Sequence, residues 1–241
     1  EKVTQIAENA DELENYNTMP DNEWGLCEDK ERPVIAVAKD EAFCFYYEDN
    51  LRLLEESGAR IEYFSPLYDT RLPDKCCGIL IGGGYPELYA ERLSRNTNML
   101  LAINQAVESE MPIVAECGGF MYLHEFMEDM KGNTHSMLGI LKGTAYKLSK
   151  LARFGYIELK SNKMSVLGNE NLFCRGHEFH YFDSTSNGTD FVARKPLSNR
   201  SWECIHANEN GVAGFPHMYY YSNPQMIVDF LKKCERNVEG A

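Results

Sequence analysis

The segment PIVAECGGFMYL, residues 112–123, carries the clearest chemical signal, because a short apolar run leads directly into Cys117 and two glycines. A strand that turns sharply into a helix at this point would form a nucleophile elbow with cysteine in place of serine. Such a turn lifts the sulfur above the sheet, and the start of the following helix would lower the pKa of the thiol. The segment predicts that Cys117 is a nucleophile rather than a small buried side chain.

A second glycine-rich turn lies in ILIGGGYPELYAE, residues 79–91, where three glycines follow a buried strand. Backbone N–H groups there could cradle a phosphate, but no G-K-[ST] follows and the G-x-G-x-x-G pattern is absent. A tight turn that needs positive φ is the plain alternative. We favour an oxyanion hole, in which N–H groups of Gly83, Gly84 and Gly118 hold the oxygen of a tetrahedral intermediate.

A cysteine nucleophile needs a base, and the sequence offers six histidines. His217 follows a strand predicted over Gly211–Phe215, and ligand groups gather at the carboxyl ends of strands in a doubly wound sheet. Cys117 would occupy such an end too, so we predict that His217 is the base. His177 and His180, in RGHEFHY, are its competitors. Packing or solvated roles are expected for His124, His135 and His206.

Short apolar runs alternate with helical stretches, as in a parallel sheet covered by helices. We predict an α/β fold: a doubly wound, mostly parallel sheet with helices on both faces, plus added antiparallel strands over residues 137–194. The predicted strands of the main sheet are Val34–Ala38, Arg60–Phe64, Gly78–Ile81, Ile113–Ala115 and Gly211–Phe215. The predicted helices are Phe43–Ser57, Glu87–Glu108, Phe120–Met130 and Pro224–Cys234.

Composition and charge indicate where the domain begins and which classes of partner are excluded. Residues 1–32 are rich in Glu, Asp and Asn and predict a polar leader, followed by one domain over residues 33–241. The net charge of −13 argues against a nucleic-acid groove or an anionic membrane surface as partner. No run of about 18 apolar residues could span a membrane, and the N-terminus lacks a secretory layout. We therefore expect a cytoplasmic protein.

The eight cysteines predict no metal site, because no C-x-x-C pair is present to seed one. Without an export signal, reduced thiols are expected, and most of them should be small core residues. Cys117 is the exception. The others are Cys27, Cys44, Cys76, Cys77, Cys174, Cys204 and Cys234.

The chain resembles class I glutamine amidotransferases of the cobyrinic acid type, most closely the C-terminal half of the cobyrinic acid a,c-diamide synthases. The matching stretches are DEAFCFYYEDNLRLLEESGA, IGGGYPELYAERLS, AECGGFMYL, ARFGYIEL, RGHEFHY and HMYYYSNP. The resemblance implies that Cys117 forms a glutamyl thioester and that His217 is the base. Many class I relatives carry a Glu two residues after this histidine, where this sequence has Tyr219. The resemblance thus implies a Cys–His dyad without a named acidic third residue.

The resemblance also implies partners. Residues 1–20 look like the tail of an N-terminal ATP-binding domain, which would bind ATP and Mg²⁺, whereas this domain needs no cofactor. Ammonia from glutamine would amidate the a and c acetate groups of cobyrinic acid, with hydrogenobyrinic acid and nickel-sirohydrochlorin as alternative acceptors. A homodimer is left open. The residues that could face the tetrapyrrole are Arg153, Tyr156, Arg175, His177 and His180.

Two functions of other kinds remain as alternatives. A non-catalytic module would keep the fold and only dock a partner or bind a tetrapyrrole, so a glutamine analogue would leave Cys117 unlabelled. A cysteine peptidase or hydrolase on a related sheet would turn over peptides or esters rather than glutamine.

Overall fold

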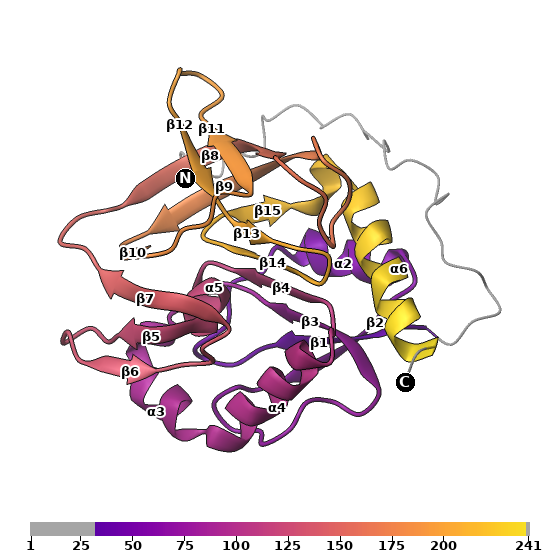
Figure 1. The fold of residues 1–241 in the computed structure, drawn as a ribbon, viewed down its shortest axis with the longest axis horizontal. Coiled ribbons are helices and arrows are strands. Elements are labelled where there is room, and N and C mark those ends of the chain that lie inside the picture. Colours follow the sequence, from indigo (N-terminus) through magenta and orange to yellow (C-terminus); the bar gives the residue numbers. More distant parts are fainter. Residues whose placement is uncertain (1–31, 240–241) are drawn as a thin grey trace, which may run out of the picture.

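The computed structural model describes residues 32–239, so the predicted leader lies almost wholly outside the described residues. A six-stranded sheet with the order β13-β14-β4-β3-β1-β2 forms the centre of the molecule (Figure 1). Its strands pair in parallel except β13 with β14. The bounds are β1 Val34–Ala38, β2 Arg60–Phe64, β3 Cys76–Ile81, β4 Ile113–Glu116, β13 His206–Ala207 and β14 Gly211–Gly214.

Helices cover both faces of this sheet, which confirms the predicted doubly wound α/β fold. Alternate residues of β1 point to opposite sides, so Ile35 and Val37 join one apolar cluster and Ala36 and Ala38 join the other. The first cluster is completed by α2 and α6, and the second by α3, α4 and α5. The helices are α2 Glu48–Glu56, α3 Ala90–Arg95, α4 Thr97–Glu108, α5 Gly118–Leu123 and α6 Gln225–Glu239.

Two smaller sheets confirm the predicted strand-rich section. One has the order β10-β7-β5-β6, and the other has the order β12-β11-β8-β9-β15 and is antiparallel throughout. The second sheet ends on β15, which carries His217. The bounds are β5 His124–Glu128, β6 Thr134–Ser136, β7 Leu141–Lys147, β8 Arg153–Ser161, β9 Phe173–His180, β10 Phe182–Ser184, β11 Phe191–Arg194, β12 Ser201–Cys204 and β15 His217–Tyr219.

The helix predicted over Phe120–Met130 was wrong in its second half. Helix α5 ends at Leu123, and β5 begins at the next residue. Phe126 and Met130, which gave the sequence its helical spacing, are exposed. Strand pairing of β5 with β6 and β7 outweighs the local pattern, as tertiary context commonly does.

Two other predicted helices are shorter than expected. Residues 43–47 form a loop before α2, and Phe45 in that loop makes an isolated bridge with Gly83. The stretch Glu87–Glu108 is divided at Asn96, whose side chain accepts a hydrogen bond from the N–H of Met99 and so caps α4. A short 3₁₀ turn, Pro86–Leu88, precedes α3. No helix within residues 32–239 is long and apolar enough to cross a membrane.

Candidate active site

Cys117 occupies the sharp turn between β4 and α5, as the sequence predicted. Its backbone angles are φ 51° and ψ −102°, a conformation that costs a non-glycine residue on the order of 1–3 kcal/mol. The turn is held from both sides, because the N–H of Cys117 donates to the carbonyl of Gly214 at 2.8 Å and its carbonyl accepts from Met121 at 3.0 Å. The side chain is buried.

The two glycines after Cys117 let α5 approach the loop that follows β3. The N–H of Gly119 donates to the carbonyl of Gly82 at 2.9 Å, and a Cβ on Gly119 would come within 2.1 Å of the Ile81 carbonyl oxygen. A Cβ on Gly118 would come within 3.2 Å of the Gly84 nitrogen. The elbow and the glycine loop therefore form one packed unit.

The glycine loop differs from a phosphate cradle, because two of its N–H groups are already bonded. Gly82 donates to the hydroxyl of Tyr46 at 2.9 Å, and Gly83 donates to the carbonyl of Phe45 at 3.2 Å. Of the three predicted oxyanion donors, Gly84 and Gly118 lie against each other beside the elbow. The N–H of Gly118 also faces the sulfur of Cys117.

His217 leaves the sheet at the same edge as Cys117. Strands β4 and β14 pair in parallel with Glu116 opposite Gly214, so Cys117 and His217 follow the carboxyl ends of neighbouring strands. The imidazole is buried, with the ring of Phe45 against it at 4.7 Å in an edge-on arrangement. The structure thus brings together the two ends that the sequence predicted.

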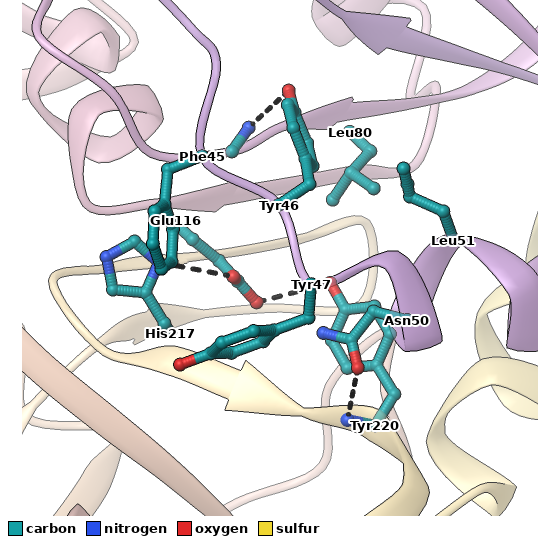
Figure 2. Close-up of a pocket in the computed structure, with 10 residues that line it drawn as sticks. Phe45, Tyr46, Tyr47, Asn50, Leu51, Leu80, Glu116, His217 and Tyr220 are labelled. Atoms are coloured by element: carbon teal, nitrogen blue, oxygen red, sulfur yellow. Dashed lines mark hydrogen bonds and ion pairs between the residues drawn. The ribbon is translucent and has the colours of Figure 1, made fainter. Parts of the chain in front are cut away.

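Glu116 faces His217 from the last position of β4, as Figure 2 shows. Its Oε2 lies 4.0 Å from Nδ1 of His217, and its Oε1 accepts from the Met218 N–H at 3.4 Å and the Tyr220 hydroxyl at 3.2 Å. Glu116 was not among the site residues predicted from the sequence. A signal was present, since a carboxylate stood at the end of a strand that was otherwise apolar and predicted to be buried.

A small pocket lies between α2, β15 and the glycine loop (Figure 2). The amide of Asn50 closes its base, donating to the Met218 carbonyl at 2.7 Å and accepting from the Tyr220 N–H at 2.9 Å. These bonds fix the backbone on either side of Tyr219. The pocket is lined by Phe45, Tyr46, Tyr47, Asn50, Leu51, Leu80, Gly82, Glu116, His217 and Tyr220.

Burial sets the protonation states of the site. It lowers the pKa of His217 to about 4, with smaller contributions from His177 and His180, so the imidazole is neutral at pH 7. It raises the pKa of Cys117 to about 12, and the charge of Glu87 adds to this effect. The predicted lowering of the thiol pKa was therefore wrong, because burial outweighs the field of the short helix α5. The free site pairs a thiol with a neutral base.

Burial also raises the pKa of Glu116 to about 8, against the two hydrogen bonds from Met218 and Tyr220 that favour its charged form. The group is therefore ionised only above about pH 8 in the free site. A positive charge beside it, such as an imidazolium at His217, would favour the ionised form.

The competing histidines have other surroundings. His177 lies directly opposite His217 in the β9–β15 register, between the rings of Phe154 and Tyr156. His180 stacks flat on Phe215 at 4.0 Å, with its Nδ1 2.6 Å from the Phe182 carbonyl. Of the other histidines, His124 is buried between Phe120 and Ser184, His135 pairs with Asp129, and His206 contacts Ser186.

The five residues predicted to face a tetrapyrrole lie on two sides of the β8–β9 pair. Tyr156, Arg175 and His177 belong to the outer face, where Tyr156 is 78% exposed. Arg153 stacks over Trp202 on the inner side, and its Nε lies 4.0 Å from Glu178. His180 is buried on that side as well. The rings that form the outer face, named here the aromatic face, are Phe154, Tyr156, His177, Phe179 and Tyr181.

The chain is similar to known proteins over most of its length. The model of the CobB/CobQ-like glutamine amidotransferase domain matches residues 34–224. A cobyrinate a,c-diamide synthase from Caldanaerobacter subterraneus subsp. tengcongensis is 43% identical over 208 residues, which are 85% of this chain and 46% of that protein. One from Salmonella typhimurium is 41% identical over 207 residues, 84% of this chain and 45% of that protein. The chain spans about half the length of these relatives.

Solved structures share the fold at much lower sequence identity. PurLQS from Thermotoga maritima aligns with a TM-score of 0.59 at 17% identity, covering 86% of this chain and 99% of that chain. A glutamine amidotransferase from the same organism aligns with a TM-score of 0.51 at 11% identity, covering 87% and 100%. At these identities the likeness concerns the fold alone.

Proposed function

The chain belongs to the CobB/CobQ-like glutamine amidotransferase domain family, and on that premise we propose that Cys117 and His217 hydrolyse glutamine through a covalent thioester. One observation carries the proposal. A buried cysteine on a strained strand-to-helix turn shares one sheet edge with a buried, neutral histidine that leaves the neighbouring strand. Glutamine-hydrolysing amidotransferase chemistry needs this pair of a nucleophile and a proton acceptor.

In the first half of the reaction, the sulfur of Cys117 bonds to the carboxamide carbon of glutamine while the thiol proton passes to His217. A lowered pKa keeps His217 free to accept that proton, and a raised pKa keeps Cys117 protonated until substrate is present. The oxyanion that forms is held by the N–H groups of Gly84 and Gly118, which lie beside the elbow. Gly83 serves instead by leaving room for the imidazole.

In the second half, His217 returns its proton to the nitrogen of the intermediate, the carbon–nitrogen bond breaks, and ammonia leaves. Water then attacks the thioester and gives its proton to His217, which passes it to the departing sulfur. Glutamate and the free thiol are regenerated. A positioned base in this role typically contributes about 10²–10⁴ in rate.

We propose that the ammonia is used in a reaction of a longer protein that contains this domain. We propose that an N-terminal domain binds ATP and Mg²⁺ and activates carboxylates of a tetrapyrrole, with cobyrinic acid as acceptor. The 43% identity to a cobyrinate a,c-diamide synthase supports this substrate. No group of His, Cys, Asp and Glu within residues 32–239 could hold a metal ion. We propose that this domain needs no cofactor of its own and that the protein is cytoplasmic.

We propose that the aromatic face receives the tetrapyrrole or lies along its path. Tyr156 and Arg175 are exposed there. His177, which belongs to the same face, is paired with His217 in the β9–β15 register. Exposed rings offer flat apolar contact to a macrocycle, and a guanidinium pairs with carboxylates. Arg153 and His180, which lie on the inner side, hold this sheet in place rather than contact the ligand.

A glutamine-mimicking electrophile tests the assignment of Cys117. Diazo-oxo-norleucine should modify one cysteine among the eight, because within residues 32–239 only the elbow thiol lies beside the proposed oxyanion hole. Peptide mapping should place the label on Cys117, and excess glutamine should protect it. Cys76 is an internal control, since it is only partly buried and lies at the start of β3, at the other end of the strand from the glycine loop. A label mainly on Cys76 or another cysteine would refute the proposal.

A further inference from the structure

Tyr219 does not take over the role of the carboxylate that many class I relatives carry at this position. Its ring is 40% exposed and lies edge-on to Tyr47, and its hydroxyl donates to Asp49 at 3.5 Å. In register with Arg175, it lies on the same side of β15 as His217, but its hydroxyl is directed to Asp49 rather than to the imidazole. The imidazole of His217 therefore has to be oriented by another group.

Glu116 is the carboxylate that meets this requirement. In the described part of the chain it is the only acidic group within 4.0 Å of a ring nitrogen of His217. Two donors, the Met218 N–H and the Tyr220 hydroxyl, are directed at Oε1, which leaves Oε2 facing Nδ1. Figure 2 shows the carboxylate between His217 and Tyr220, at the base of the pocket.

We propose that Glu116 is a positioning residue that holds His217 with its proton on Nδ1 and its Nε2 free to take the thiol proton. This inference rests on the proposed glutaminase function. Burial raises the pKa of Glu116 to about 8, so the group is ionised above that pH. The ionised carboxylate can only accept at Oε2, so the Nδ1 that faces it is then the donor. The lone pair then falls on Nε2, as the base requires.

The surrounding bonds support this role over simple packing. Asn50 ties the backbone of Met218 and Tyr220 on either side of Tyr219, so the segment that follows His217 is fixed relative to α2. Glu116 is adjacent to Cys117 in the chain, so one turn sets the places of the nucleophile and of the group that orients its base. A shift of about 1 Å would turn the 4.0 Å approach into a hydrogen bond.

Glu116→Gln is the informative variant. If the amide nitrogen took the place of Oε1, its hydrogens would meet the Met218 N–H, so the amide nitrogen should turn toward His217 instead. Nδ1 would then accept, and Nε2 would carry the proton and lose its function as base. We expect kcat for glutamine hydrolysis to fall by about 10- to 10³-fold, with KM for glutamine changed less than about threefold.

Two further variants separate positioning from structure. Glu116→Asp keeps the carboxylate at a greater distance and should recover part of the kcat that Glu116→Gln loses. Glu62→Gln makes the same change on β2, at the opposite edge of the central sheet, so its kcat should stay within about threefold of the wild type. A kcat for Glu116→Gln within about threefold of the wild type would overturn the proposal.

A second readout does not depend on turnover or on the folding of any variant. In the wild-type chain above pH 8, where Glu116 is ionised, the ¹⁵N chemical shifts of the His217 ring should report a protonated Nδ1 and an unprotonated Nε2. The reverse tautomer would overturn the inference whatever the kinetics show. Absence of glutamine hydrolysis in the wild type, together with the predicted tautomer, would instead count against the proposed function and leave the role of Glu116 in place.

Discussion

Gly83 and His217 are in direct contact, because the imidazole ring lies over the glycine loop with no space between them. A Cβ on residue 83 would come within 2.4 Å of Cε1 of His217, closer than real side chains approach. Gly83 is also fixed by backbone hydrogen bonds in both directions with Phe45, whose ring packs on the same imidazole. Gly83 and Phe45 together therefore limit where the imidazole of His217 can lie.

We predict that Gly83→Ala lowers glutaminase kcat at least about tenfold in a protein that remains folded, because a displacement near 1 Å at the reacting groups can cost about 100-fold. Gly211→Ala is the control, since it lies at the other end of β14 with Ile113 Cγ2 at 3.2 Å as the nearest atom. Glutamate release and circular dichroism would be measured for both. Equal activities would show that the contact does not position the base.

The choice of base is tested by three substitutions. His217→Asn should lower glutamine hydrolysis by about 10² or more, since a positioned base contributes that much. His177→Asn should leave basal hydrolysis near normal, and His180→Asn should mainly lower stability through the lost stacking on Phe215. The measurements are glutamate release and thermal unfolding. Retained activity in His217→Asn with loss in His177→Asn would reverse the assignment.

The pH dependence of kcat/KM follows from the protonation state of His217. Burial lowers its pKa to about 4 from its ordinary value near 6.5, so the base stays unprotonated as pH falls from 7 toward 5. An acid limb caused by His217 should therefore lie below pH 6, where folding is checked separately by circular dichroism. Burial raises the pKa of Glu116 to about 8, so a second limb near pH 8 is expected in the wild type and should be absent in Glu116→Gln. An acid limb centred near 6.5 in Glu116→Gln would mean that His217 is more solvated, or is not the base.

The aromatic face is tested in the whole protein that contains this domain. Tyr156→Ala and Arg175→Ala should each raise the KM for the tetrapyrrole several-fold, because both are exposed on the outer side of β8 and β9. Tyr63→Ala is the matched control: Tyr63 is also exposed but lies on β2, at the opposite edge of the central sheet. An unchanged tetrapyrrole KM in both variants would contradict this part of the proposal.

Cys117 and His217 could be proposed from the sequence because each depends on a local pattern. A buried strand that runs into Cys-Gly-Gly defines an elbow, and a histidine after another strand must lie near the same edge of a parallel sheet. The doubly wound core followed from the same alternation. The carboxyl ends of β4 and β14 are indeed neighbours, because the N–H of Cys117 donates to the carbonyl of Gly214.

Features that depend on tertiary contact were beyond the sequence. The contact between Glu116 and His217 joins β4 to β15, and no local spacing links them. The helix predicted through Met130 fails because β5 pairs with β6 and β7, and the thiol pKa rises because of burial that the sequence does not display. The assignment of residues 1–32 to a separate leader stays a prediction.

The central claim, that Cys117 supplies ammonia by cleaving glutamine, is tested most directly by Cys117→Ala in the whole protein. Amidation would be assayed with glutamine and, in parallel, with added ammonia, which bypasses the thioester and leaves the ATP-dependent step untouched. We predict that glutamine-dependent amidation is lost while ammonia-dependent amidation stays close to the wild-type rate. Equal loss of both activities in a folded variant, or retention of the glutamine-dependent activity, would contradict the account.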